Sequence, residues 1–216
     1  MEEIKMSFYI KKLLSICGKE LSSKQAIHNF SELSSSSGWE QLKEMLAAKN
    51  GFYGFESALH IFPYESINEE VGLLDWNEKS LWISSYKDMA LGALYFAEDV
   101  FGGQFCIRND GVYSFDPETA EFNKIAETIN DWCKLILKNY NVLTGYSLAH
   151  SWQKSNGAIP SGYRLVPKIP FVAGGAYEID NLYLKCTYES LIERANIALQ
   201  IRDIPDGSSI QIIIQD

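Results

Sequence analysis

The chain has 216 residues, of which 46% are hydrophobic and 22% are charged, and its net charge at pH 7 is −9. This composition is typical of a folded globular protein and excludes a disordered, collagen-like or coiled-coil chain. The first residues lack the basic start and apolar run of a signal peptide, and no apolar run approaches the ~20 residues of a membrane helix. We therefore expect a cytoplasmic protein that forms one large or two small domains.

The N-terminal quarter has helical spacing. Acids precede lysines over residues 2–14, which predicts a first helix, and residues 22–33 predict a second, short helical turn before a polar connector at 34–38. Residues 39–49 place Trp39, Leu42, Met45 and Leu46 on one face and predict a further helix. Asn50-Gly51 ends it, because both residues tolerate the left-handed conformation.

Aromatic residues and short apolar runs follow. Phe52, Tyr53 and Phe55 are expected in the core. Residues 58–62 predict a strand that ends at Pro63, and residues 81–83 predict another. His60 lies between apolar neighbours, which favours a hydrogen-bonded structural role over catalysis or metal binding.

Residues 93–116 predict three strands separated by turns at 101–103 and 109–111. We expect Pro117 to stop this ladder and to open a helix. A helical stripe then runs from Ile125 to Ile136 and beyond, and Gly145 favours two helices over one.

The C-terminal segment combines extended and helical patterns. Residues 160–170 are expected to be extended, 177–184 to form a strand and 210–214 a final strand, while Thr187 is expected to cap a helix. Gly174-Gly175 lacks the G-x-G-x-x-G spacing of a phosphate-binding loop. This segment is expected to pack on the preceding core.

Negative charge is concentrated in the middle of the chain. Residues 51–137 contain fifteen Asp or Glu but only five Lys or Arg, whereas the flanking segments are nearly balanced. Such a field repels nucleic acid and attracts a basic partner. A solvated face that keeps the protein soluble is the alternative explanation.

An ordered set of motifs covers about residues 30–138. A W-x-x-L helix precedes Asn50-Gly51 and an aromatic residue, followed by ALHIFP at 58–63, FAEDVFGGQFCI at 96–107, Gly-Val-Tyr at 111–113 and a closing helix. This order resembles the SMI1/KNR4 (SUKH) superfamily. One departure is Asp116-Pro117-Glu118, where many members have Asp-His-Glu.

The resemblance implies an α+β fold with a central, mostly antiparallel sheet flanked by helices. It also implies a single SMI1/KNR4-like domain over residues 1–216, with a core at 30–138 and a C-terminal extension at 139–216. Bacterial members are similar to immunity proteins that neutralise protein toxins, many of them nucleases, and fungal members regulate other proteins by binding them. The resemblance thus implies a binding module that is not an enzyme.

Five acids of the central block are candidate partner-binding residues: Glu98, Asp99, Asp110, Asp116 and Glu118. We expect them to face basic residues that the toxin uses for its substrate. Exposed aromatic side chains such as Trp76 or Tyr86 would anchor the contact. Because neighbouring strand residues point to opposite faces, Glu98 and Asp99 are not expected to act together unless a bulge intervenes.

Other functions remain as alternatives. A regulatory or scaffold protein without a toxin partner is the first, and a hydrolase that uses clustered carboxylates is the second. The four cysteines are far apart and lack C-x-x-C spacing, so they are expected to be small apolar side chains, and no metal or cofactor is predicted. No local signature ties a cysteine to one of the three histidines.

Overall fold

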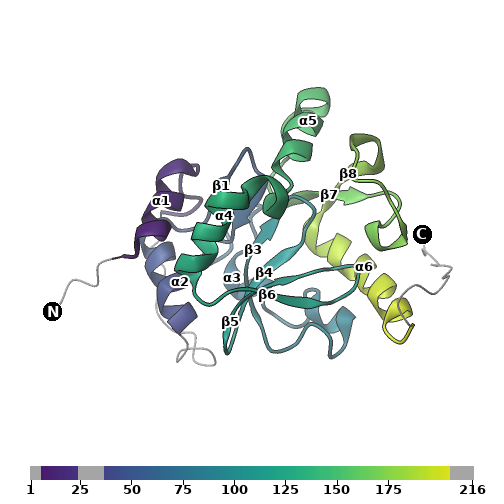
Figure 1. The fold of residues 1–216 in the computed structure, drawn as a ribbon, viewed down its shortest axis with the longest axis horizontal. Coiled ribbons are helices and arrows are strands. Elements are labelled where there is room, and N and C mark those ends of the chain that lie inside the picture. Colours follow the sequence, from purple (N-terminus) through teal and green to yellow (C-terminus); the bar gives the residue numbers. More distant parts are fainter. Residues whose placement is uncertain (1–5, 24–36, 205–216) are drawn as a thin grey trace.

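A computed structural model describes residues 6–23 and 37–204 of the chain (Figure 1). Its α-helices are α1 (Phe8–Ile16), α2 (Ser37–Ala48), α3 (Leu73–Trp76), α4 (Ile129–Thr144), α5 (Tyr146–Asn156) and α6 (Thr187–Ile201). Its strands are β1 (Phe52–Gly54), β2 (Leu59–Ile61), β3 (Leu94–Asp99), β4 (Gln104–Arg108), β5 (Gly111–Phe115), β6 (Phe122–Ala126), β7 (Tyr163–Pro167) and β8 (Leu182–Cys186). Short 3-10 helices lie at Ile83–Tyr86, Phe171–Ala173 and Ile179–Asn181.

The central sheet has six strands in the order β1-β2-β3-β4-β5-β6, and every neighbouring pair is antiparallel. The expected α+β fold with an antiparallel sheet is therefore confirmed. A register shift between Tyr95 and Ala97 interrupts the pairing of β3 with β4. Beyond this bulge the alternation resumes, so that Glu98 and Asp99 point to opposite faces of the sheet.

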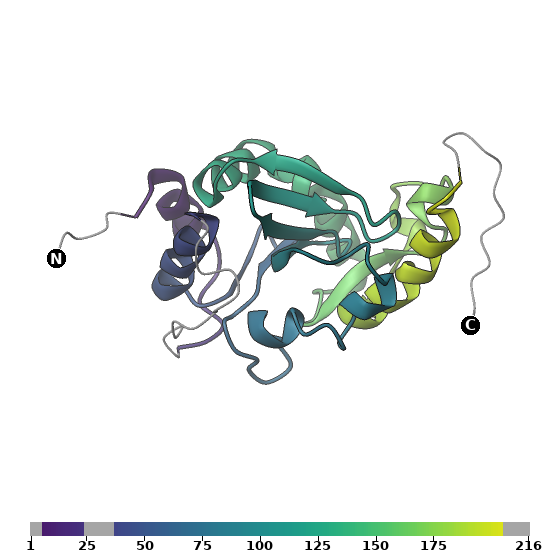
Figure 2. The ribbon, with the colours of Figure 1, turned by 90° about the horizontal axis from the view of Figure 1, so that it is seen from below.

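Aromatic side chains fill the space on both faces of the sheet. On one face Trp132 of α4 makes edge contacts with Phe96 and Phe105, at ring-centroid distances of 5.0 and 5.4 Å. On the other face Trp82 contacts Tyr95, at 4.7 Å. The views in Figures 1 and 2 show α1 and α2 at one end of the sheet and α6 at the other.

The C-terminal segment packs against the end of β3. Strands β7 and β8 form a separate two-stranded sheet, and the amide of Leu165 in β7 donates a hydrogen bond to the carbonyl of Val100, at 2.8 Å. Leu191, Ala195 and Ala198 of α6 are buried in the same apolar cluster as the central sheet. The segment thereby brings its own side chains to both faces of β3.

Two predicted elements are wrong. Residues 81–83 do not form a strand, because Trp82 is buried in a turn and its indole N–H donates to the carbonyl of Trp76, at 2.9 Å. Pro117 does not open a helix. Instead Asp116 Oδ1 accepts a hydrogen bond from the amide of Glu118, at 2.7 Å, and the turn leads into the unpredicted strand β6.

Other local predictions agree with the structure, differ from it by one position or lie outside the described residues. Gly145, at φ +71°, separates α4 from α5, which confirms two helices. The prediction that Thr187 caps α6 is wrong by one position, because Cys186 is the N-cap and Thr187 is the first helical residue. Residues 24–33 of the helical turn expected at 22–33, and the final strand expected at 210–214, lie outside the described residues. In the described part of the chain, no helix combines the length and the apolar character required to span a bilayer.

Candidate functional site

The five predicted acids fall in three different places. Asp99, Asp116 and Glu118 line one pocket, which lies at the α4 side of the sheet. Glu98 lies on the opposite face, where it pairs with Arg164. Asp110 is exposed in the β4–β5 hairpin, at the far end of β4 from the pocket, and accepts a hydrogen bond from the hydroxyl of Tyr113. The acidic block of the sequence is therefore not one surface.

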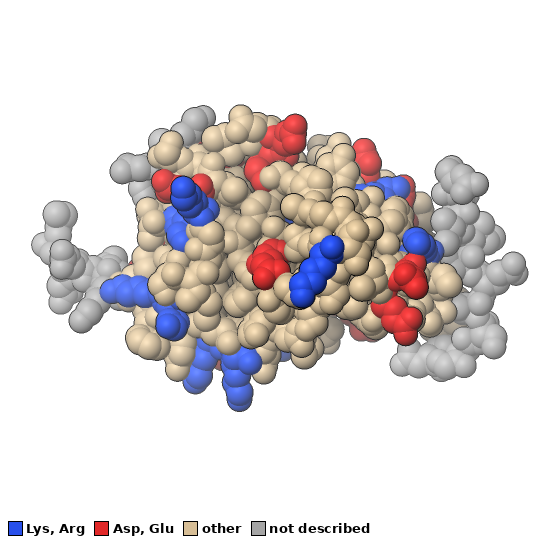
Figure 3. Space-filling view, turned by 90° about the horizontal axis from the view of Figure 1, so that it is seen from above, with Lys and Arg blue, Asp and Glu red and all other residues tan. Residues whose placement is uncertain are grey.

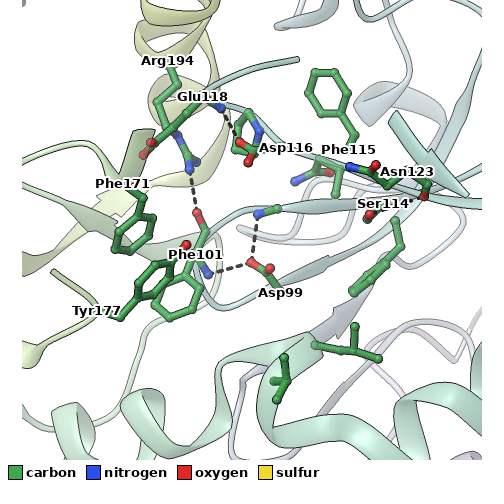
Figure 4. A pocket seen from close by; sticks show the side chains of 16 residues that line it. Asp99, Phe101, Ser114, Phe115, Asp116, Glu118, Asn123, Phe171, Tyr177 and Arg194 are labelled. Carbon is green, nitrogen blue, oxygen red and sulfur yellow. Dashed lines mark hydrogen bonds between the residues drawn. The ribbon is translucent and has the colours of Figure 1, made fainter. Parts of the chain in front are cut away.

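The pocket has a volume of about 270 Å³ and is partly open (Figure 4). We call it the Arg194 pocket, and its principal lining residues are Asp99, Phe101, Asp116, Glu118, Phe171, Tyr177 and Arg194. They come from β3, from the turns that follow β3 and β5, from the 3-10 helix after β7 and the loop that follows it, and from α6. Segments distant in the sequence therefore build one site.

Asp99 is held by the turn between β3 and β4. Its Oδ1 atom accepts hydrogen bonds from the amides of Phe101 and Gly103, each at 2.8 Å. A Cβ atom at Gly103 would lie 2.6 Å from Asp99 Oδ2, so a larger residue there would displace the carboxylate. Burial outweighs these hydrogen bonds and raises the pKa of Asp99 to about 7.

Glu118 is 3% exposed, and only one of its two carboxylate oxygens accepts a hydrogen bond among the described residues. Its Oε2 atom accepts a hydrogen bond from the amide of Val172, at 2.8 Å. Its Oε1 atom is buried and has no hydrogen-bond partner among the described residues. Burial raises the pKa of this carboxyl. An unpaired buried acceptor of this kind is costly, and a donor from outside would remove that cost.

Arg194 is the cation of the pocket, yet it binds uncharged oxygen atoms. Its guanidinium donates to the carbonyl of Phe101, at 2.8 Å, and to the hydroxyl of Ser190, at 3.0 Å. Gly102, at φ +78°, permits this approach, because a Cβ atom there would lie 2.6 Å from Arg194 Nη2. No carboxylate of the described residues lies within 4.0 Å of an Arg194 nitrogen. Among the described residues, the acids of the pocket therefore have no direct ion pair.

Aromatic and apolar side chains surround these acids. The rings of Phe171 and Tyr177 are stacked at 3.9 Å, and both make edge contacts with Phe101. Figure 4 shows these three rings together on one side of Asp99. Tyr177 is 63% exposed, and Val142 of α4, which also lines the pocket, is 82% exposed. Large apolar surface is thus available at the edge of a pocket lined by three carboxyl groups.

Glu98 has the opposite environment. It is 1% exposed, and its carboxylate lies 2.8 Å from Arg164 Nη2 and 3.1 Å from His60 Nδ1. Burial alone would raise the pKa of Glu98, but Arg164 and the hydrogen bond from His60 together hold it below its usual range. The Nδ1 atom of His60 is therefore hydrogen-bonded, as expected.

The predicted aromatic anchors are wrong. Trp76 is 2% exposed and donates its indole N–H to Gln104 Oε1, at 2.9 Å, while Tyr86 is fully buried. Glu98 is likewise too deeply buried to contact a protein partner. Both aromatic residues lie in segments that have the sequence pattern of loops, where large rings also serve as core.

Sequence reasoning missed Arg194, Phe171, Tyr177 and Val142. Arg194 had one detectable signal, because it follows Leu191 by three positions on the apolar face of α6. A cation inside an apolar stripe indicates a buried, hydrogen-bonded arginine. The other three had none, because single apolar residues occur on most protein surfaces.

The described residues form neither a metal-binding cluster nor a reactive thiol site. They contain no group of three or more His, Cys, Asp or Glu side chains that could hold a metal ion. All four cysteines are free thiols, of which Cys106 and Cys133 are buried. Burial raises the pKa of Cys17 to about 12, and it also raises those of Cys106 and Cys133. These three thiols are therefore poor nucleophiles.

Surface charge is more mixed than the sequence suggests. On the face shown in Figure 3, Lys and Arg side chains are interspersed with Asp and Glu side chains. Cations from the C-terminal segment pair with acids of the central block, as Arg202 does with Asp88, at 2.8 Å, and as Arg164 does with Glu98. Part of the negative charge that has no ion pair among the described residues lies in the Arg194 pocket.

Comparison with known proteins identifies a shared fold and no family. The chain matches no protein-family model, and no curated protein matches it in sequence. Its structure is similar to the crystal structure of Atu4351 from Agrobacterium tumefaciens, with a TM-score of 0.54 over 87% of this chain and 88% of that one. Their sequence identity is 12%, so this similarity concerns the fold alone. The SUKH resemblance stays a prediction.

Proposed function

We propose that the chain is a protein-binding module whose Arg194 pocket receives a basic side chain of its partner. One observation carries this proposal: Asp99, Asp116 and Glu118 converge on a pocket whose own arginine is engaged by carbonyl and hydroxyl oxygens. An arginine or lysine from outside would supply the missing ion pair. It would also satisfy the free oxygen of Glu118.

The size and walls of the pocket support a single side chain as its occupant. A cavity of about 270 Å³ is smaller than the ~300–1,000 Å³ of pockets for drug-sized ligands. The rings of Phe101, Phe171 and Tyr177 would lie beside the cation, and aromatic faces attract guanidinium and ammonium groups. Val142 and the exposed side of Tyr177 would add apolar contact around it, as in the centre of many protein interfaces.

The SUKH resemblance supports a more specific proposal, that the partner is a bacterial protein toxin. Nuclease toxins use basic side chains to bind phosphate, so an acidic pocket that captures such a side chain would block the substrate site. The protein would act in the cytoplasm as an immunity protein without catalysing a reaction. A regulatory or scaffold protein with another basic partner remains the alternative.

The test uses the toxin domain encoded immediately upstream of this gene, if one is present. Association of the purified proteins is measured for the wild type, for Asp116→Asn combined with Glu118→Gln, and for Asp110→Asn as an exposed control of the same chemistry. We expect the double variant to weaken binding at least about tenfold, since two charge-assisted contacts are lost, and the control to bind as the wild type does. Added salt should slow association.

Two results would overturn the proposal. One is a toxin domain that does not bind the wild-type chain. The other is equal weakening by the pocket variants and by Asp110→Asn, because binding would then depend on net charge rather than on the pocket. Absence of a toxin gene, together with binding of another basic protein that the double variant abolishes, would support the regulatory alternative.

A further inference from the structure

A second cavity of about 270 Å³ lies on the opposite face of the sheet from Asp99. We call it the His60 cavity, and the residues that carry the argument are His60, Glu70, Glu98, Phe62, Trp76 and Val71. It lies beside β2, β3 and α3 and extends to the ends of β7 and β8. This cavity plays no part in the function proposed above.

The imidazole of His60 has a fixed orientation and one free nitrogen. Its ring stacks on Tyr53, with centroids 4.3 Å apart, and meets Phe62 edge-on. Nδ1 lies 3.1 Å from the carboxylate of Glu98, which can only accept, so Nδ1 carries the proton in the neutral ring. Nε2 is then an acceptor, and it is buried without a hydrogen-bond partner among the described residues.

A second acceptor lies beside this nitrogen. Glu70 Oε2 is 3.5 Å from His60 Nε2, and Glu70 is 6% exposed. The hydroxyl of Tyr53 donates one proton to this carboxylate, at 3.0 and 3.1 Å from its two oxygens, which leaves further lone pairs open. Burial lowers the pKa of His60, which disfavours a proton on Nε2. A donor between His60 Nε2 and Glu70 Oε2 would therefore come from a ligand.

We propose that the His60 cavity binds a primary ammonium group, whose nitrogen lies between His60 Nε2 and Glu70 Oε2. Two acceptors 3.5 Å apart can both lie at a hydrogen-bonding distance of about 2.9 Å from one nitrogen atom. An ammonium group supplies several donors and a positive charge. Three glutamates, Glu69, Glu70 and Glu98, line the cavity, and the cation that the described residues place beside them is Arg164, behind Glu98. The alkyl part of the ligand lies against the rings of Phe62 and Trp76. The same rings attract the ammonium group, because aromatic faces attract cations.

The test titrates the full-length protein with n-butylamine while the side-chain nitrogen signals of the three histidines are followed by NMR. n-Butanol serves as the uncharged control of the same shape. Nα-acetyl-lysine amide is the third probe, because a free amine and a lysine side chain of a peptide present the same group. We expect the amine to move the Nε2 signal of His60 in a saturable way, and n-butanol to leave it in place.

Variants test whether the change in the His60 signal comes from binding in the His60 cavity. Glu70→Gln keeps the shape but removes the charge, and it should weaken amine binding at least about tenfold, as expected for loss of a charge-assisted hydrogen bond. Val71→Phe should block the cavity while the contact between His60 and Glu98 persists. Asp116→Asn combined with Glu118→Gln should leave the His60 response unchanged, which separates this site from the Arg194 pocket.

The lysine probe decides the source of the ligand. Binding of n-butylamine alone indicates a free small amine, and binding of both probes indicates that a peptide lysine also fits. The proposal is overturned if His60 does not respond to either cationic probe, if n-butanol binds equally well, or if both cavity variants bind the amine as the wild type does.

Discussion

The two faces of β3 each place a buried arginine beside carboxylates, and they use it in opposite ways. Arg164 lies 2.8 Å from Glu98, and that carboxyl has a lowered pKa. Arg194 instead donates to the carbonyl of Phe101, and the pKa of Asp99 in its pocket is raised to about 7. The comparison shows that an arginine near a buried carboxyl group does not by itself keep the pKa of that group low. What matters is which oxygens the guanidinium binds.

This difference in the pairing of the two arginines distinguishes the structural pair of Glu98 and Arg164 from the Arg194 pocket, where we propose that a partner binds. The buried ion pair between Arg164 and Glu98 joins β7 to β3 and pairs the two charges within the chain. Acids that keep unsatisfied hydrogen-bonding capacity lower the stability of the free protein, and they recover that energy when a partner supplies the donor. We therefore assign recognition to the Arg194 pocket and structural support to Glu98 and Arg164.

Arg164→Met should have the largest effect on stability. Arg164 is fully buried, and its loss leaves the carboxylate of Glu98 without its cation. We expect the free energy of unfolding to fall by about 3–5 kcal/mol, as measured by chemical denaturation. Combining it with Glu98→Gln should recover part of the loss, because no unpaired charge then stays buried.

Arg194→Met should cost less, about 1–3 kcal/mol, because it leaves a carbonyl and a hydroxyl without a donor but breaks no direct ion pair. The same denaturation measurement applies to both arginine variants. A loss as large as that of Arg164→Met would mean that Arg194 is paired with a carboxylate in solution, and it would remove the contrast between the two faces.

Asp99→Asn should change the pH dependence of stability. The pKa of Asp99 is about 7 in the folded protein, against an ordinary value of 3.8, so the folded state holds the proton more tightly. The stabilising contribution is complete below about pH 4 and is lost as the pH rises through 7. Partial solvent exposure limits it to about 1–2 kcal/mol. Unfolding curves at several pH values should show a flatter profile for Asp99→Asn, and an unchanged profile would contradict the assignment.

Asp110→Asn should have the smallest effect. Asp110 is exposed, and its contacts with Tyr113 and Lys124 lie at the tip of the hairpin. We expect no measurable change in the free energy of unfolding by chemical denaturation, because solvent screens the contacts of an exposed carboxylate. A measurable loss would show that the hairpin acids matter for the fold, and the residue would then be unsuitable as a control.

Local sequence rules predicted the central part of the fold. The meander of β3, β4 and β5 followed from alternation and turn residues, and the strand period separated Glu98 from Asp99. Strand β6 was missed because its residues lead directly into α4, and the helical spacing of apolar residues extends back to Ile125 within the strand. The strand predicted at 81–83 was wrong because burial in a turn has no periodic signal.

The site was only partly predictable, since its electrostatics depend on contacts between distant residues. Asp99, Asp116 and Glu118 were recognised as candidates because they lie at turns of the acidic block. Their environment depends on Arg194, which is 93 positions from Phe101, the residue whose carbonyl it contacts. The lowered pKa of Glu98 depends similarly on a distant residue, Arg164. No spacing rule reports which of two arginines pairs with a carboxylate.

Carboxyl NMR titration of the free protein tests the contrast between the two faces most directly. The chemical shifts of the side-chain carboxyl carbons of Asp99, Glu118 and Glu98 are followed against pH. We predict that Asp99 titrates near pH 7, that Glu118 titrates above its usual range and that Glu98 titrates below it. If Asp99 and Glu118 instead titrate at ordinary values, the pocket holds no uncompensated acids and the proposed recognition of a basic side chain loses its basis.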